Sequence, residues 1–273
     1  MVGINKIVNE RLDILVFYDI IDMGDKMKFD FTGKTVIVTG GTSGLGYGIS
    51  KAFINAGASV IAFYRSNTEK AEKVIKELNI DNNFKAVKVD VSNEEAMIEA
   101  FKGIDKLDYL VNCAGISNED DFIKLPMDKI KEVFETLLFG KMIACKCAYP
   151  LLLKSNSPRV INIASRFASR PLAGATPLTA AEAGIVMFTK NLALEWAKDR
   201  IKVNAVSPSL TTNTGSYYEF YTDADAEEIG KNNPSGRLGK LDDVANTVLF
   251  LCTEEAEYIN GENINVNGGI LLK

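Results

Sequence analysis

Two spacings of apolar residues alternate along the chain from residue 34 onward. Short apolar, β-branched runs predict strands at residues 35–38, 58–63, 84–89, 107–111, 159–163, 201–206 and 264–266. Apolar residues three or four positions apart predict helices over residues 46–56, 68–78, 94–101, 127–153, 179–198 and 241–252. Strands that alternate with helices are typical of βαβ units. The pattern therefore predicts an α/β fold, a parallel sheet with helices on both faces.

The chain is predicted to form one domain over residues 31–273, preceded by an N-terminal extension of residues 1–30. No linker rich in proline, glycine or serine divides it. Residues 10–23 fit an amphipathic helix, and their densest apolar run, Ile14 to Tyr18, is too short and too acidic for a signal peptide. No stretch approaches the 18 or so apolar residues that a membrane-spanning helix needs, so no membrane partner is expected.

Charge and composition exclude several classes of function. The 31 basic and 36 acidic residues give a net charge of −5 with no basic block, so nucleic acid is not an expected partner. The chain has no histidine, which rules out a Ser-His-Asp triad, a Cys-His pair and an imidazole base. Its four cysteines lack zinc-site spacing. We expect reduced thiols in a cytoplasmic protein and no metal site.

A glycine-rich turn follows the first predicted strand and opens a helix. This is the context that a dinucleotide-binding turn requires. A glycine allows the tight turn, another lets the backbone approach a pyrophosphate, and the last permits close helix packing. The alternative is a connecting turn without a ligand. The expected cofactor contacts are Gly40, Thr42, Ser43, Gly44, Leu45 and Gly46.

The end of the second predicted strand bears on the choice between NAD and NADP. An NAD site usually has an acidic residue here for the ribose 2′-hydroxyl. This chain has Tyr64, Arg65 and Ser66 instead. An arginine and a hydroxyl suit a 2′-phosphate, so NADP(H) is favoured over NAD(H). The alternative for Arg65 is a solvated surface residue.

Several segments, in order, resemble motifs of the short-chain dehydrogenase/reductase family. Residues 39–46 match its TGxxxGxG turn, 112–115 its NNAG segment, 203–208 its VNxVxP segment, 237–245 its RxGxPEDVA segment and 261–269 its terminal strand. The resemblance covers about residues 31–270. It implies a Rossmann-like, doubly wound single domain of about seven strands, and a homo-tetramer or dimer. It adds these cofactor contacts: Asp90, Val91, Asn112, Ala114, Gly115, Glu182 and Pro208.

The resemblance also places the family's catalytic serine, tyrosine, lysine and asparagine. Ser165 fits the serine, which is retained. The tyrosine position, thirteen residues further on, holds Leu178, and the lysine position, four residues later, holds Glu182. The asparagine position, three residues before Gly140, holds Leu137. Three of the four groups are therefore expected to be absent in their usual role. No tyrosine occurs between Tyr149 and Tyr217 to replace the missing phenol.

These replacements are expected to impair carbonyl/alcohol interconversion. Leucine supplies no proton, and general acid–base help is typically worth about 10²–10⁴-fold. Glu182 reverses the charge at its position, which favours the cationic, oxidised nicotinamide. Candidates for lost functions are Glu182 itself, Arg166 and Arg170 as an anion site, and a tyrosine of the following lid segment. That segment contains Tyr217, Tyr218, Phe220 and Tyr221, and aromatic residues in a lid are more often a hydrophobic cover.

Three functions remain open from the sequence. The first is an oxidoreductase of this family that binds a nicotinamide dinucleotide and acts, weakly or atypically, on an unknown small molecule. The second is a catalytically silent, cofactor-binding subunit of a homo-oligomer or of a hetero-oligomer with an active homologue. The third is a non-redox lyase or isomerase that uses Glu182. Fold alone does not decide among them.

Overall fold

Seven parallel strands form one sheet in the computed structural model, which describes residues 29–79, 81–215 and 221–272. The order across the sheet is β3-β2-β1-β4-β5-β6-β7, so the winding reverses between β1 and β4. This confirms the predicted α/β fold of a single doubly wound sheet. The predicted helix over residues 10–23 and Tyr217, Tyr218 and Phe220 lie outside the described residues. The strands are β1 (Thr35–Thr39), β2 (Ser59–Tyr64), β3 (Phe84–Lys88), β4 (Tyr109–Asn112), β5 (Arg159–Ile163), β6 (Lys202–Pro208) and β7 (Asn263–Val266).

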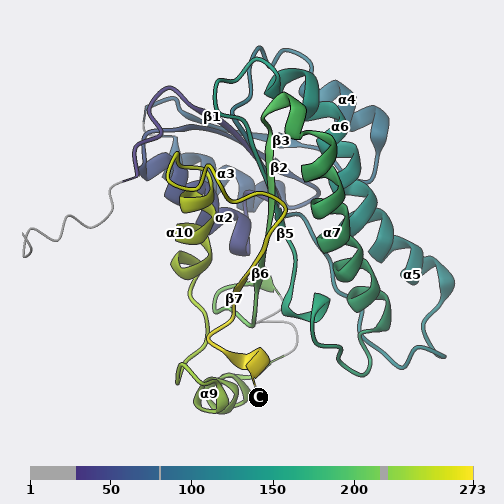
Figure 1. The fold of residues 1–273 in the computed structure, drawn as a ribbon. Helices are drawn as coiled ribbons and strands as arrows, with labels where there is room; N and C mark the ends of the chain where they lie inside the picture. Colours follow the sequence, from purple (N-terminus) through teal and green to yellow (C-terminus); the bar gives the residue numbers. More distant parts are fainter. Residues whose placement is uncertain (1–28, 80, 216–220, 273) are drawn as a thin grey trace, which may run out of the picture.

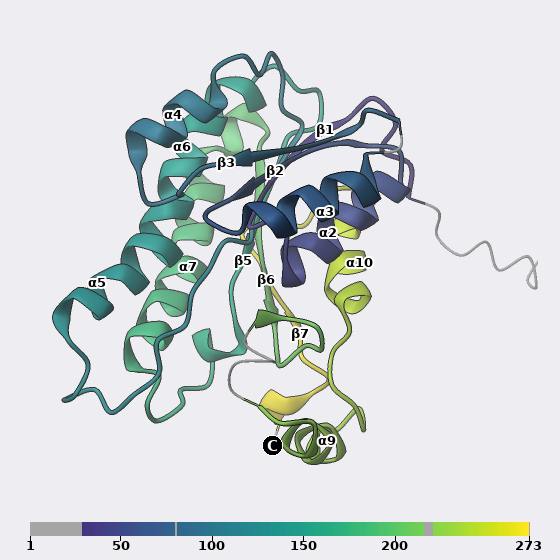
Figure 2. The ribbon, with the colours of Figure 1, turned by 180° about the vertical axis from the view of Figure 1, so that it is seen from behind.

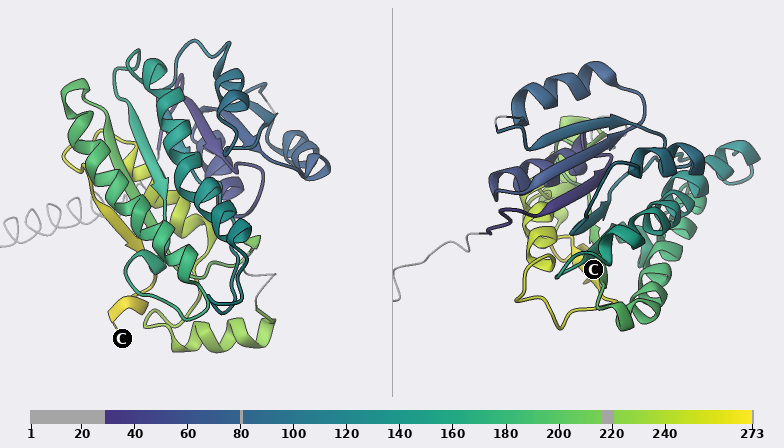
Figure 3. Two further views of the ribbon diagram at one scale, coloured as in Figure 1. Left: turned by 90° about the vertical axis from the view of Figure 1, so that its right-hand side faces the viewer. Right: turned by 90° about the horizontal axis from the view of Figure 1, so that it is seen from above.

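Helices cover both faces of the sheet (Figure 1). One face carries α2 (Gly44–Asn55), α3 (Thr68–Leu78) and α10 (Leu241–Leu251). The other carries α4 (Glu94–Phe101), α5 (Met127–Phe134), α6 (Gly140–Leu152) and α7 (Thr176–Glu195). Figure 3 shows α7, in green, alongside the long teal helix that α5 and α6 form end to end. The helix α9 (Asp223–Asn232) lies beyond the carboxyl ends of the strands, near the C-terminus (Figure 2). It was not predicted from the sequence.

The strands form because their apolar, β-branched residues are buried from both sides. All residues of β4 and β5 are buried, and β1 is buried from Val36 to Thr39. Side chains then fix the helix starts: Asn67 accepts a hydrogen bond from the Lys70 backbone N–H at 2.9 Å and so caps α3. Three short 3₁₀ turns, η2 (Arg166–Ala168), η3 (Ala197–Asp199) and η4 (Ile270–Leu272), complete the chain. No helix in the described ranges is long and apolar enough to cross a membrane.

The predicted long helix over residues 127–153 has a wider turn inside it. A π-helical stretch, η1 (Glu135–Phe139), joins α5 to α6 without a loop between them. Such turns insert one extra residue per turn and occur often at functional sites. Here the wide turn contains Leu137, a residue of the predicted catalytic set.

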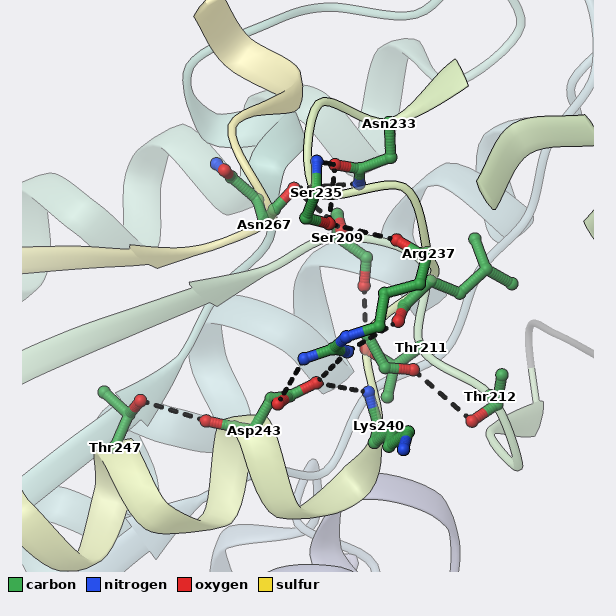
Figure 4. Close-up of polar contacts among 12 residues, drawn as sticks. Ser209, Thr211, Thr212, Asn233, Ser235, Arg237, Lys240, Asp243, Thr247 and Asn267 are labelled. Atoms are coloured by element: carbon green, nitrogen blue, oxygen red, sulfur yellow. Dashed lines mark hydrogen bonds and ion pairs between the residues drawn. The ribbon is translucent and has the colours of Figure 1, made fainter. Parts of the chain in front are cut away.

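Polar contacts tie the segments that follow β6 and β7 to the start of α10 (Figure 4). Arg237 forms two hydrogen bonds with the Asp243 carboxylate, at 2.6 and 2.9 Å. The same carboxylate accepts the backbone N–H of Lys240 at 2.7 Å, which fixes the first turn of α10. Asn233 donates from its side chain to the Asn267 carbonyl at 3.1 Å. These contacts hold the chain that borders the carboxyl edge of the sheet.

Candidate functional site

A cleft of about 680 Å³ opens at the carboxyl ends of the strands. It spans the point where the strand order reverses, which is where doubly wound folds bind ligands. The structure brings nearly all the predicted site residues to this one cleft. Of the expected cofactor contacts and catalytic positions, only Asn112 does not line it. The lining includes Gly40, Thr42, Ser43, Gly44, Leu45, Gly46, Tyr64, Arg65, Ser66, Asp90, Val91, Ala114, Gly115, Leu137, Ser165, Leu178, Glu182 and Pro208.

The glycine turn has the geometry of a phosphate cradle. Gly40 and Gly44 have φ values of +69° and +50°, which disfavour any side chain. A Cβ on Gly46 would lie 2.7 Å from the carbonyl carbon of Gly40, so α2 can begin this close to the strand only with glycine. The Ser50 hydroxyl donates to the Gly41 carbonyl at 3.0 Å and holds the turn from below. The N-terminus of α2 thus faces the cleft with room for a pyrophosphate.

Basic and hydroxyl groups line the cleft where β2 ends. Arg65, Ser66 and Lys70 lie there. Arg65 is half-exposed, with its Nη1 atom 3.8 Å from Glu132 Oε1. Asp90, at the end of β3, directs its carboxylate to its own turn and accepts hydrogen bonds from the Ser92 backbone and hydroxyl at 3.0 and 2.7 Å. This end therefore presents more donors than acceptors to a ligand.

Asn112 is fully buried behind the cleft, where its side chain forms hydrogen bonds within the sheet. Its amide donates to Asn162 Oδ1 at 2.9 Å, and the Asn162 amide donates to the Thr189 hydroxyl at 2.9 Å. Thr39 Oγ1 accepts the backbone N–H groups of Cys113 and Ala114, each at 3.0 Å. These bonds lock the ends of β1, β4 and β5 together beneath the cleft.

The predicted catalytic positions lie together at the other end of the cleft. The Ser165 hydroxyl caps η2 by accepting the Phe167 N–H at 3.3 Å. Leu178 and Leu137 are 6% and 4% exposed and belong to one apolar cluster with Val133 and Ile185. At the positions predicted for the family's tyrosine and asparagine, the cleft is therefore lined by the apolar side chains of Leu178 and Leu137.

Lys141 and Glu182 form a buried pair of opposite charges beside this apolar floor. They lie on α6 and α7, are 3% and 5% exposed, and both line the cleft. Lys141 Nζ donates to the Ala114 carbonyl at 3.1 Å, whereas Glu182 Oε2 is buried without a hydrogen-bond partner. Burial raises the pKa of Glu182 to about 7, although the Lys141 charge opposes the rise. Burial lowers the pKa of Lys141, and Glu182 opposes that shift.

The remaining candidates divide between the cleft and its surroundings. Arg166 lines the cleft and stacks on Phe167, 4.7 Å from the ring centroid. Arg170 instead donates to the Ile270 carbonyl at 3.1 Å, outside the cleft. Tyr221 reaches both the main cleft and a smaller cavity beneath α9. The four cysteines are unpaired thiols, and no group of three or more metal-ligating side chains occurs in the described part of the chain.

Comparison with known proteins identifies the family. A family model described as enoyl-(acyl carrier protein) reductase matches residues 40–271. The chain is 35% identical over 252 residues to 3-oxoacyl-[acyl-carrier-protein] reductase FabG of Aquifex aeolicus, a match that covers 89% of this chain and 100% of that protein. The chain belongs to the short-chain dehydrogenase/reductase family. It is 33% identical to the FabG of Staphylococcus aureus, over 88% of this chain and 98% of that one.

Solved short-chain dehydrogenase/reductase structures superpose on nearly the whole chain. A short-chain dehydrogenase from Bacillus anthracis gives a TM-score of 0.80 at 30% identity and covers 86% of this chain and 95% of its own. A second structure is a protein from Beutenbergia cavernae, provisionally assigned as an NAD(P)-dependent gluconate 5-dehydrogenase and holding NADP at low occupancy. It gives a TM-score of 0.83 at 27% identity and covers 90% of this chain and 100% of its own. The family of NAD(P)-dependent oxidoreductases predicted from the motifs is therefore confirmed.

Sequence reasoning missed Lys141 in this short-chain dehydrogenase/reductase. The Lys141 ammonium on the neighbouring helix interacts electrostatically with Glu182. A signal was present: Leu137, Lys141, Ala144, Cys145 and Ala148 follow helical spacing, and all five are buried. A lysine on an otherwise apolar stripe needs a buried partner, and Glu182 occupies the same kind of position on α7.

Proposed function

We propose that this chain binds a nicotinamide dinucleotide, preferring NADP(H), and catalyses carbonyl/alcohol hydride transfer only weakly or atypically. The glycine turn supports cofactor binding, because its cradle excludes side chains yet faces an open cleft. Arg65, Ser66 and Lys70 support the preference for a 2′-phosphate. When bound, the cofactor would supply the hydride donor or acceptor, and the chain would supply position and proton control.

One observation carries the weak redox activity. Leu178 and Leu137 pack in a single apolar cluster at the positions assigned to the family's tyrosine and asparagine. Of the residues that line this end, Ser165 keeps a hydroxyl for a substrate oxygen, but Leu178 has no proton to give. A buried lysine and glutamate occupy the floor beside it.

The decisive experiment restores the missing groups and compares turnover. Leu178→Tyr/Glu182→Lys would place two ammonium groups in one buried site, so Lys141→Met is added to remove the second. Turnover is measured with NADPH and NADH on a carbonyl panel, including 3-oxoacyl thioesters because the relatives are named for them. We expect the triple variant to exceed the wild type by about 10²-fold or more. Equal turnover would refute the weak-activity proposal, and no binding of either nucleotide would refute cofactor binding.

A catalytically silent subunit is the second candidate, favoured by exposed apolar residues on the helical face. Phe139, Met187 and Leu194 are 49%, 63% and 78% exposed on η1 and α7. Apolar side chains grouped on one face of a chain are typical of a subunit interface. Light scattering would then report a dimer or tetramer. Purification from the source organism together with an active homologue would support a mixed oligomer, and a monodisperse monomer would contradict both assemblies.

A further inference from the structure

The buried pair on the floor of the cleft has no counterpart in the motifs that place this chain in its family. The family's lysine position carries a carboxylate, Glu182, and a lysine one residue after Gly140 faces it from α6. Both side chains line the cleft although each is less than 6% exposed. The Glu182 Oε2 atom is buried without a hydrogen-bond partner, so no protein donor satisfies the carboxylate there.

The ends of the cleft indicate which part of a dinucleotide reaches this pair. The glycine turn, at the reversal of strand order, would hold the pyrophosphate. The groups at the end of β2 would take the adenosine half, because that strand lies on one side of the turn. Ser165, Pro208 and Glu182 line the opposite side, reached from β5, β6 and α7. The nicotinamide half of a cofactor would therefore lie toward Lys141 and Glu182.

We infer that Lys141 and Glu182 select the oxidation state of the bound cofactor, with preference for the oxidised form and release of a proton from Glu182. This inference rests on the proposed cofactor binding. The oxidised nicotinamide ring carries a positive charge and the reduced ring none. Only the oxidised form gains from a carboxylate that is ionised, and the low-dielectric floor strengthens that attraction. The adjacent Lys141 ammonium offsets part of the carboxylate charge and so limits the gain.

The other titratable groups around Glu182 do not compete for this role. They are Cys113 after β4, Arg166 in η2 and Tyr221, which line the cleft, and Cys145 on α6, which interacts with Lys141. Burial raises the pKa of Cys113 and of Cys145 to about 12, so both thiols stay neutral near pH 7. Lys141 is the charge that acts on the Glu182 pKa. Since that pKa is about 7, the carboxyl is part protonated in the unliganded protein.

The sign of the pH dependence follows from linkage. A cation that binds beside Glu182 lowers the pKa of its carboxyl, so affinity for the oxidised form rises with pH until the unliganded carboxyl is itself ionised. The reduced form has no such gain. Each unit by which the ligand lowers this pKa changes the affinity ratio about tenfold. We expect the affinity for NADP⁺ relative to NADPH to rise about tenfold from pH 6 to pH 8.

The test is a fluorescence and calorimetric titration of the full chain with NADP⁺ and NADPH between pH 6 and 8. The ratio of the two dissociation constants cancels the titration of the shared 2′-phosphate, whose pKa is about 6. Calorimetry in buffers of different ionisation enthalpy measures proton release directly on the wild type. Glu182→Gln should leave a ratio that does not vary with pH. Glu195→Gln, an exposed glutamate on the same helix, should behave like the wild type.

Lys141→Met separates the two members of the pair. Without the ammonium, the pKa of Glu182 should rise further, so the increase in the ratio moves to higher pH. Two nucleotides that bind with a pH-independent ratio and no proton release would overturn the inference while leaving the proposed function intact. A pH-dependent ratio that persists in Glu182→Gln would overturn it as well. Failure of both nucleotides to bind would instead refute the proposed function.

Discussion

The two ends of the cleft differ in how they use polar groups. The glycine-turn end keeps open backbone, hydroxyl groups and basic side chains, all of which suit a phosphate-bearing ligand. At the other end, Leu137 and Leu178 lie at the positions predicted for polar groups, and the charged side chains of Lys141 and Glu182 are buried. The binding end keeps the family's motif residues, and the reaction end is the part that we propose to be altered. We therefore expect substitutions at the two ends to affect cofactor binding and catalysis separately.

The largest effect should come from restoring the reaction end in steps. Leu178→Tyr alone should raise turnover less than tenfold, because the ionised Glu182 nearby disfavours a phenolate. Adding Glu182→Lys and Lys141→Met should raise it about 10²–10⁴-fold over the wild type. Steady-state kinetics on one carbonyl substrate measures both steps. Full activity from Leu178→Tyr alone would show that Lys141 already lowers the pKa of the new tyrosine. The reaction end would then lack only the phenol.

The binding end should fail when its cradle is filled. Gly46→Ala places a methyl group against the backbone of Gly40, so the turn must shift away from the pyrophosphate position. We expect cofactor affinity to fall about 100-fold or more in a fluorescence titration. Gly103→Ala is the control outside the cleft: Gly103 has open space around it, so any cost there comes from its φ of +80° and not from a contact with the turn. Undiminished affinity in a folded Gly46→Ala variant would mean that the ligand does not use this turn.

The reaction end should reveal its buried carboxyl through the pH dependence of stability. Burial raises the pKa of Glu182 from 4.5 to about 7, so between these values the folded chain holds a proton that the unfolded chain releases. The free energy of unfolding therefore falls as pH rises through this window. Glu182→Gln removes that loss and should be more stable than the wild type by about 3 kcal/mol at pH 8, with little difference at pH 4.5. Urea denaturation at both pH values tests this.

Equal effects of Glu182→Gln at the two pH values would show that Glu182 is not a buried acid with a raised pKa. Glu195→Gln is again the control, because its carboxyl lies on the same helix in solvent. It should change stability by less than about 0.5 kcal/mol at either pH.

The sequence predicted the binding end better than the reaction end for a physical reason. The turn at Gly40, Gly44 and Gly46 and the strand before it are local in sequence, and their spacing alone indicates the geometry. All seven strands were likewise predicted from apolar runs. Lys141 and Glu182 are far apart in the chain and interact electrostatically only because α7 packs along the continuous helix of α5, η1 and α6. The π-helical turn in η1 and the helix α9 left no periodic signal, so both were missed.

The smallest effect should come from the surface network that supports the edge of the cleft (Figure 4). Asp243→Asn removes the charge from the two Arg237 contacts, which are half-exposed and screened by solvent. We expect a loss of about 1 kcal/mol in the free energy of unfolding at pH 7.

The hydrogen bonds from Arg237 hold the pKa of Asp243 below its usual value, so the difference from the wild type should vanish as pH falls through that lowered pKa. Glu69→Gln, in an exposed pair with Lys73 on α3, should cost less than about 0.5 kcal/mol. Cofactor affinity should be unchanged in both variants; a tenfold loss in Asp243→Asn would place the network among the groups that shape the binding end.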